Sequence, residues 1–334
     1  MFFVQHRNIF LAITGIFTAA CIGIIVVLGI PFGIDFTGGA LNEVSYANAP
    51  QKEVLETALE PLDLGVYSLR ETIIEGGNSG YVLRTRDLSE AERVLVQTAL
   101  TSVGEEGQLL RYTSVGPTIG QELKDKAVWA IGAVVLMIVL YVAYAFRGIG
   151  QIGKNNVSSW VYGLITILAL AHDVIVPAAV FSLLGYFMGA EADVLFIMAL
   201  LAVLGYSVND TIVMFDRVRD NLERNQTDAK RLLETHGKEK QAEADAILHE
   251  PFEVTVGRAT DNALLRSFNT SFTTLLTLGA LFYFGGDVTR DFALILLAGV
   301  VAGTYSSIAM ANPLLVFIAS RLPVQEPEKQ AVVE

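Results

Sequence analysis

The sequence predicts a polytopic α-helical membrane protein with six transmembrane helices and one small α+β domain between the first and second of them. Of the 334 residues, 52% are hydrophobic and only 17% are charged, whereas soluble domains average about 25% charged residues. Six apolar runs are also long enough to span, since about 20 helical residues cross the hydrocarbon core. They are Ile9–Ile30, Ala127–Phe146, Val161–Met188, Val194–Phe215, Ala263–Phe284 and Phe292–Ile318.

The first apolar run lies where a signal peptide would lie. It is longer than a typical signal-peptide core, and no cleavage site of the small-x-small kind follows it. We therefore expect residues 1–32 to be a retained N-terminus and first transmembrane helix.

The orientation follows from the short loops, because cytoplasmic loops retain Lys and Arg. The loop after the second run carries Arg147 and Lys154, and the loop at 216–262 carries eight Lys and Arg residues. The loop "MGAEAD" has no basic residue, and the loop after the fifth run has only Arg290. Both termini are then cytoplasmic, residues 33–126 form an outer domain, residues 127–320 hold the other five helices, and residues 321–334 form a cytoplasmic tail.

The outer segment alternates strand and helix patterns. "ALNEVSY", "GVYSLRETII", "GYVLRTRD" and "GQLLRYTSV" are typical of strands, and the turn sequence "EGGNSG" separates the second from the third. "QKEVLETALEPL" and "LSEAERVLVQTALTSV" predict helices, the latter with Ser89 as N-cap three residues before Glu92. The order βαββαβ predicts a ferredoxin-like arrangement.

Several functional classes are excluded or disfavoured by the residues present. Cys21 is the only cysteine, so an intrachain disulfide or a thiolate metal site is impossible. His236 and His249 are too far apart, and lack the companions, to suggest a metal site. The outer segment has no His and no nucleophile-base set, and no G-x-x-x-x-G-K-[ST] loop is present to bind a nucleotide. We expect no enzyme activity, no cofactor and no nucleic-acid partner.

Five segments resemble the signature segments of the SecF family, whose members are subunits of the SecDF protein-export complex in the resistance-nodulation-division superfamily. They are "GIDFTGG", "VGPTIGQEL", "AHD", "GYSVNDTIVMFDRVRDN" and "RSFNTSFTTLL", in this order. The resemblance implies a cell-membrane protein that works with SecD and the SecYEG channel, with YajC as a further partner. It also implies that the proton-motive force is used to help unfolded polypeptides across the membrane.

Two other functional classes are kept open. The closer one is a proton-driven exporter of lipids or small molecules in the same superfamily, although such exporters usually carry two six-helix halves and larger outer domains. The other is an intramembrane aspartyl protease, for which the chain lacks a YD…GxGD pattern.

The stretch "GYSVNDTIVMFDRV" places Asp210 inside a predicted span, where an ionisable group is costly unless it has a function or a partner. Asp210 lies six residues before Asp216, about 9 Å from the cytoplasmic end of its span, and Arg266 lies five residues after Asp261, about 7.5 Å from the same side. We expect the two to form an acid-base pair that changes on protonation, and the resemblance implies that both conduct protons. The residues do not decide between H⁺ and Na⁺.

The third span contains a second acidic candidate, Asp173, for proton transfer. His172, Asn209, Asn269 and Thr270 are candidates for lining a hydrated path, together with Ser267 and Ser271. The same polar side chains could instead form hydrogen bonds between helices.

Three further patterns complete the expectations. In "GIDFTGG", Gly38 and Gly39 predict a close-packed turn or hinge between membrane and outer domain, fixed by Asp35. "GVVAG" at 299–303 predicts a close helix contact. The charged stretch 225–254 predicts an exposed cytoplasmic helix, either a solvated insertion or a docking element.

Overall fold

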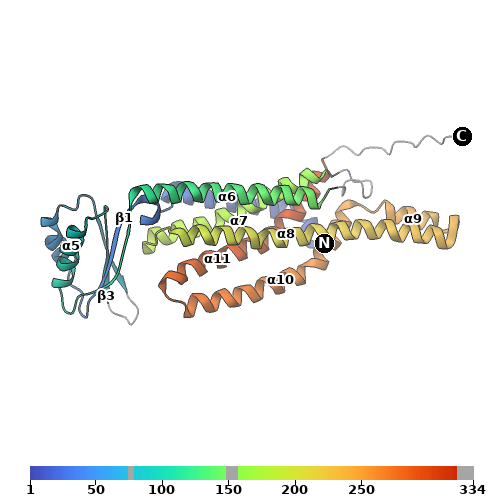
Figure 1. Ribbon diagram of the computed structural model, residues 1–334. Helices are drawn as coiled ribbons and strands as arrows, with labels where there is room; N and C mark the ends of the chain where they lie inside the picture. Colours follow the sequence, from blue (N-terminus) through green and yellow to red (C-terminus); the bar gives the residue numbers. More distant parts are fainter. Residues whose placement is uncertain (74–78, 148–156, 322–334) are drawn as a thin grey trace. The chain divides into compact units, whose positions relative to one another are not determined.

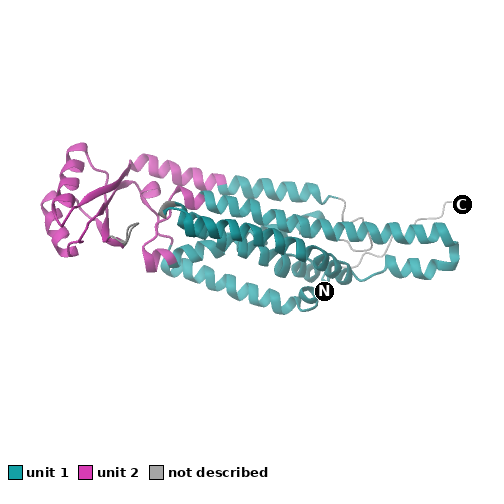
Figure 2. Ribbon diagram, turned by 90° about the horizontal axis from the view of Figure 1, so that it is seen from below, with its two compact units in different colours: residues 1–29, 131–183, 198–334 teal, residues 30–130, 184–197 magenta. Residues whose placement is uncertain are grey.

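The computed structural model describes residues 1–73, 79–147 and 157–321 (Figure 1). Most of the predicted turn "EGGNSG", Lys154 and residues 322–334 of the predicted tail lie outside this range. The chain divides into two compact units (Figure 2). One consists of Met1–Gly29, Ile131–Leu183 and Met198–Glu334, and the other of Ile30–Ala130 and Leu184–Ile197.

The second unit contains a four-stranded antiparallel sheet with the strand order β2-β3-β1-β4. Its elements follow the predicted order along the chain: β1 (Gly39–Ser45), α4 (Lys52–Leu59), β2 (Ser68–Ile73), β3 (Ser79–Thr85), α5 (Glu90–Ser102) and β4 (Gln108–Val115). Figure 1 shows α5 beside the sheet. The sheet alternates buried and half-exposed positions along β1 and β3, and one face packs with both helices around a core that includes Val44, Leu55, Leu83, Val96 and Leu100.

Helix α5 begins at the predicted cap. The side chain of Ser89 accepts from the backbone N–H of Glu92, and the Glu92 carboxylate accepts from the Ser89 N–H at 2.8 Å, which forms a complete capping box. Hydrogen bonds from Arg86 and from Ser89 hold the pKa of the Glu92 carboxyl at about 2. The cap fixes where the second helix of this unit begins.

Long helices make up the first unit. They are α2 (Arg7–Leu28), α6 (Pro117–Ala145), α7 (Ser159–Met188), α8 (Val194–His236), α10 (Phe252–Phe284) and α11 (Asp287–Ser306), followed by the short α12 (Asn312–Ala319). Helices α6 and α8 begin in the second unit, and α7 ends in it. A π-helical stretch, Ser307–Ala311, connects α11 to α12. Phe146 and Tyr162 stack, and Phe215 contacts both rings edge-on, within an apolar cluster of this unit.

Five of these helical segments are long and apolar enough to cross a membrane: Arg7–Leu28, Pro117–Ala145, Ser159–Met188, Val194–Leu248 and Thr289–Ala319. They contain most of five of the six predicted spans. The remaining one, Ala263–Phe284, lies in α10. This helix is long enough, but Ser, Thr and Asn residues interrupt its apolar run between Ser267 and Thr277. The count of six spans therefore stays a prediction.

The charged stretch 225–254 is largely helical, as predicted. Helix α8 continues to His236, and α9 (Gln241–Leu248) follows a short 3₁₀ turn. Most side chains here are exposed. Burial raises the pKa of the Glu250 carboxyl, but hydrogen bonds from Asn225 and Thr255 and the charge of Arg258 outweigh burial and lower it overall.

Helices α8 and α11 approach each other closely through the "GVVAG" pattern. A Cβ atom added at Gly299 would clash with the Val203 side chain, and one added at Gly303 would lie 2.9 Å from Ser207 Cβ. The predicted close helix contact is confirmed. On α8, the face in contact with these glycines carries Ser207. Ser207 is also part of the buried polar site described below.

Candidate functional site

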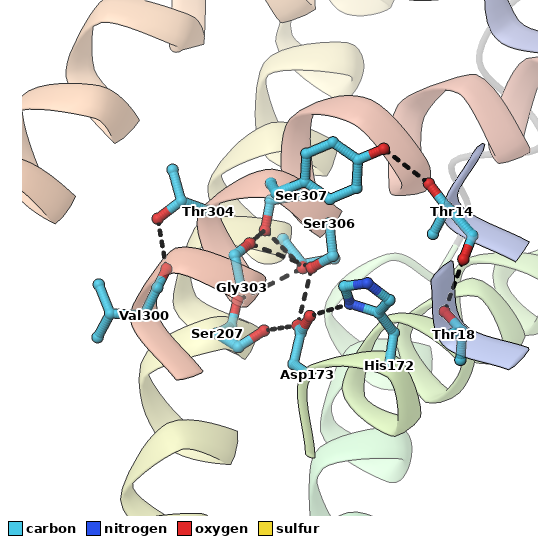
Figure 3. Close-up of polar contacts among 12 residues, drawn as sticks. Thr14, Thr18, His172, Asp173, Ser207, Val300, Gly303, Thr304, Ser306 and Ser307 are labelled. Atoms are coloured by element: carbon cyan, nitrogen blue, oxygen red, sulfur yellow. Dashed lines mark hydrogen bonds and ion pairs between the residues drawn. The ribbon is translucent and has the colours of Figure 1, made fainter. Parts of the chain in front are cut away.

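The Asp173 carboxylate is the centre of a buried polar cluster within the first unit (Figure 3). Asp173 has no exposed surface. Its Oδ1 lies 2.8 Å from Nδ1 of His172, and its Oδ2 accepts hydrogen bonds from Ser306 Oγ at 2.8 Å and from Ser207 Oγ. One carboxylate therefore connects three helical segments, α7, α8 and α11.

The backbone around this carboxylate departs from regular helix at two points. Pro177 lies inside α7 and has no N–H to donate to the carbonyl of Asp173, four residues earlier. Pro313 likewise cannot donate to the carbonyl of Ala309, within the π-helical stretch. Such stretches often occur at functional sites, and here Ser306 and Ser307, at its start, are both fully buried.

Asp210 lies one helical turn after Ser207 on α8 and is only 3% exposed. Its Oδ2 has no hydrogen-bond partner. Thr211, the next residue, shares a hydrogen bond of 3.2 Å with Ser307. The two acidic residues of the membrane region thus belong to one polar core.

Helix α10 joins this core through one face only. Thr304 donates to Ser271 Oγ at 2.6 Å, and Tyr206 donates to the same atom at 3.4 Å. Ser267, four residues before Ser271, is also buried, and its hydroxyl has no partner. Residues at this spacing share one helix face.

The predicted pair of Asp210 and Arg266 is not formed in this structure. Arg266 is exposed and makes no ion pair within the described residues, and Asp210 is buried. Matching depth does not bring two side chains together unless both face the same way. Arg266 and Ser271 are five residues apart, so they point about 140° away from each other around α10.

The residues predicted to line a hydrated path fall into two groups, one buried in the polar core and one exposed on other helix faces. His172 is buried in the cluster and contacts Asp173. Asn209, Asn269 and Thr270 are exposed and lie on other helix faces than the buried Ser207, Asp210 and Ser271. The structure therefore does not bring these three into the core. Within the described range, no group of three or more His, Cys, Asp or Glu side chains could hold a metal ion.

The segment "GIDFTGG" forms a tightly packed junction inside the second unit. Asp35 Oδ2 accepts the backbone N–H of Val194, the first residue of α8, at 3.1 Å. Gly33 N–H donates to the Ala192 carbonyl at 2.8 Å, and Ala192 N–H donates to the Pro31 carbonyl at 2.7 Å. The segment is thus fixed to the start of the helix that carries Asp210.

Comparisons with known proteins agree with these features. The model of the family described as "Protein export membrane protein SecD/SecF, C-terminal" matches residues 95–239 and 231–321. Protein translocase subunit SecF of Sebaldella termitidis is 34% identical over 303 residues, which cover 90% of this chain and 85% of the relative. For SecF of Pseudomonas aeruginosa the identity is 34% over 333 residues, covering 95% and 90%.

The chain belongs to the SecF family of protein translocase subunits. The crystal structure of SecDF, described as a translocon-associated membrane protein, from Thermus thermophilus has the same fold with a TM-score of 0.75 and 31% identity. The match covers 96% of this chain and 39% of that longer chain. The solved SecDF structure thus matches this chain over nearly its whole length.

Several residues of the polar core were not predicted from the SecF-like segments. Ser207, Ser306 and Ser307 all contribute hydroxyls to it. For Ser207 a signal was available, since Ser207, Asp210 and Thr211 recur at the three- and four-residue spacing of one helix face. No sequence signal indicated that both Ser306 and Ser307 would face inward, because this depends on the π-helical stretch.

Substitution of the junction glycines of this SecF-family chain is expected to impair export. Gly38 and Gly39 have φ angles of 72° and 123°, where other residues are strained by about 1–3 kcal/mol. An added Cβ would lie 2.8 Å from Pro117 Cα at Gly38 and would clash with the Thr85 carbonyl oxygen at Gly39. Gly38→Val and Gly39→Val should therefore reduce export in a secretion assay.

The matched control is Gly116→Val, because an added Cβ at Gly116 meets no atom within 4 Å. Membrane insertion of all three variants is checked by immunoblotting of the membrane fraction. Normal export by both junction variants would show that these glycines are ordinary turn residues.

Proposed function

We propose that this translocase subunit couples protein export to the proton gradient through the buried carboxyl groups of Asp173 and Asp210. The observation that carries the proposal is the Asp173 cluster, in which one buried carboxylate on α7 accepts hydrogen bonds from Ser207 on α8 and Ser306 on α11 and contacts His172. A charge in this position is rare among membrane helices and is usually functional. Asp210 lies next to it with one oxygen unpaired.

The cluster has two states, one with the Asp173 carboxyl group ionised and one with it protonated. The ionised Asp173 carboxylate only accepts hydrogen bonds, so the hydroxyls of Ser207 and Ser306 both donate to it. A protonated carboxyl must itself donate one hydrogen bond, and one of these contacts must then reverse or break. Because the contacts connect α7, α8 and α11, proton binding changes how these helices pack.

The energy available from the gradient is sufficient for such a change. One elementary charge that crosses the full membrane potential releases about 2.3 kcal/mol per 100 mV. A few protons in each cycle would shift a conformational equilibrium by several orders of magnitude. The junction that fixes "GIDFTGG" to the start of α8 gives this shift a route to the outer domain, through Asp35 and the N–H of Val194.

Arg266 takes part in a second conformational state under this proposal. The free Oδ2 of Asp210 is an acceptor without a partner, and Arg266 lies at a similar depth in its helix. A rotation of α10 that brings Arg266 inward would supply a positive charge to the ionised Asp210. Protonation of Asp210 would release it again. Asn209, Asn269 and Thr270 are exposed and lie outside this core.

The same proposal includes the arrangement of the chain in the cell membrane. We infer six spans, with α10 as the fifth, and both termini in the cytoplasm, because the basic residues gather in the loops at Arg147 and at 216–262. Residues 33–126 would form an outer ferredoxin-like domain, residues 1–32 the first span, residues 127–320 the other five, and residues 321–334 a cytoplasmic tail. The partners would be SecD, the SecYEG channel, YajC and unfolded polypeptides in transit.

The proposal is tested by export with each ion gradient collapsed separately. In cells that depend on this chain and its SecD partner, a protonophore at constant ATP should stop the part of export that needs the complex. A sodium ionophore should not affect it. The reverse result would assign the carboxyl cluster to Na⁺, and export that is insensitive to both would refute ion coupling.

A further inference from the structure

We propose that His172 relays protons between a groove beside α2 and the carboxylate of Asp173. This inference rests on the proton-coupling function proposed above and adds the route by which protons reach the core. The evidence for it is the difference between the two ring nitrogens of His172. Nδ1 contacts Asp173, and Nε2 has no hydrogen-bond partner.

One ring nitrogen of His172 is committed to the acidic cluster and the other is free. His172 is 2% exposed, and its Nδ1 lies 2.8 Å from Asp173 Oδ1. Its Nε2 has no hydrogen-bond partner. Buried polar atoms nearly always have a partner, so an orphaned ring nitrogen indicates a water or ligand position next to it. Figure 3 shows the His172 ring between Asp173 and the α2 residues Thr14 and Thr18.

A groove of about 900 Å³ lies beside His172 within the first unit. Side chains of α2, α7 and the end of α12 line it, and His172, Thr14 and Thr18 belong to its wall. A water molecule occupies about 30 Å³ of liquid and needs two to four polar partners. Thr14 and Thr18 are four residues apart on one face of α2, and each hydroxyl donates to the backbone carbonyl four residues earlier, at 2.8 Å. Their oxygens can still accept a hydrogen bond from a water molecule, and His172 Nε2 is a further polar partner.

The groove also has a polar end. Asn8 and Arg321 line it, and both are exposed. Other groups near the His172 ring are Tyr305 on α11, at 6.1 Å between ring centroids, and Phe17 on α2, at 6.5 Å. Tyr305 Oη shares a hydrogen bond of 3.0 Å with Thr14. Asp173 is therefore the acidic group in direct contact with the imidazole, and it is the group to which a proton would pass.

The transfer balances without any further reactant. A hydronium ion in the groove gives a proton to Nε2, and the imidazole gives its Nδ1 proton to Oδ1 of the Asp173 carboxylate. The products are water, a neutral imidazole protonated on Nε2 and a neutral carboxylic acid. After Asp173 has passed its proton on, exchange with water restores the starting tautomer: Nε2 gives its proton to a water molecule, and Nδ1 takes one up from water when the ring has rotated away from Asp173.

Chemical rescue tests this role. In liposomes that contain the complex of this chain with its SecD partner, His172→Ala should slow gradient-driven proton uptake at least about tenfold, as expected for loss of a proton-transfer group. Added imidazole can enter the space left by the side chain and should restore most of the rate. His172→Gln, which keeps a hydrogen-bond donor beside Asp173 but cannot relay a proton, should be as slow as His172→Ala.

Blocking the groove gives an independent test. Gly15 lines it, and an added Cβ there meets no atom within 4 Å, so Gly15→Leu should fill the groove without disturbing the fold. This variant should slow proton uptake and prevent rescue of His172→Ala by imidazole. The matched control is Gly23→Leu on the same helix, which also meets open space but is not among the groove-lining residues.

The outcomes separate this inference from the proposed function. Normal uptake by His172→Gln, or a loss in His172→Ala that imidazole does not restore, overturns the relay. If Asp210→Asn still loses uptake in the same assay, proton coupling stands and only the relay is wrong. If Asp210→Asn takes up protons normally, the coupling proposal itself fails. As a control, imidazole is added to liposomes that contain the Asp210→Asn variant. Proton uptake in this sample gives the leakage that imidazole causes by itself.

Discussion

Asp210→Asn is expected to leave the complex assembled while reducing gradient-dependent export by about tenfold or more, which corresponds to at least ~1.4 kcal/mol of lost coupling. Asn has nearly the same shape as Asp and keeps its hydrogen-bonding capacity, so the buried site on α8 should still pack. An amide cannot bind and release a proton. Export in inverted membrane vesicles, measured with and without a proton gradient, reports the loss.

The control for this variant is Asp220→Asn on the same helix. Asp220 is half-exposed and forms an ion pair at 2.9 Å with Arg217, three residues earlier. Exposed pairs of this kind contribute little, so export and assembly should be unchanged. Gradient-dependent export by Asp210→Asn at the rate of Asp220→Asn would remove Asp210 from the mechanism.

Asp173→Leu is expected to destabilise the first unit itself. The substitution removes the acceptor for Ser207 and Ser306 and the partner of His172 Nδ1, and all three groups are buried. Each buried group left without a partner costs about 1–3 kcal/mol, partly offset where a hydroxyl finds a backbone carbonyl of its own helix. We expect a total loss of ~3 kcal/mol and a clear fall in the unfolding temperature in detergent.

Two variants distinguish stability from coupling at this position. Asp173→Asn keeps an acceptor oxygen and should unfold close to the wild-type temperature, yet it should lose gradient-dependent export. Ser182→Ala on the same helix is the control for loss of a buried hydroxyl, because Ser182 bonds only the Ala178 carbonyl of its own helix, at 3.0 Å. An Asp173→Leu protein as stable as Ser182→Ala would show that the carboxylate does not hold α7, α8 and α11 together.

Sequence patterns predicted the elements that depend on local residues. The apolar runs located the long helices, the Ser89 and Glu92 pattern located the start of α5, and "GVVAG" indicated the close approach of two helices. These features follow from periodicity, capping chemistry and side-chain size, which can be recognised within a few turns of chain.

The parts of the site that the sequence did not predict depend on helix rotation. Arg266 and Asp210 were expected to pair because their depths match, but depth along a helix does not fix the direction of a side chain. Ser306 and Ser307 face the core together because a π-helical stretch begins there. The hydroxyl partners of Asp173 could not be predicted for the same reason, since they come from two other helical segments.

The most direct test of the account measures protonation of the buried carboxyl groups themselves. Infrared difference spectra of the reconstituted complex, recorded with and without a proton gradient, should contain a band of a protonated carboxylic acid that changes with the gradient. Asp210→Asn and Asp173→Asn should each alter or remove this band, and Asp220→Asn should leave it unchanged. A wild-type spectrum without such a band, or a band that persists in both buried variants, would contradict proton coupling at this site.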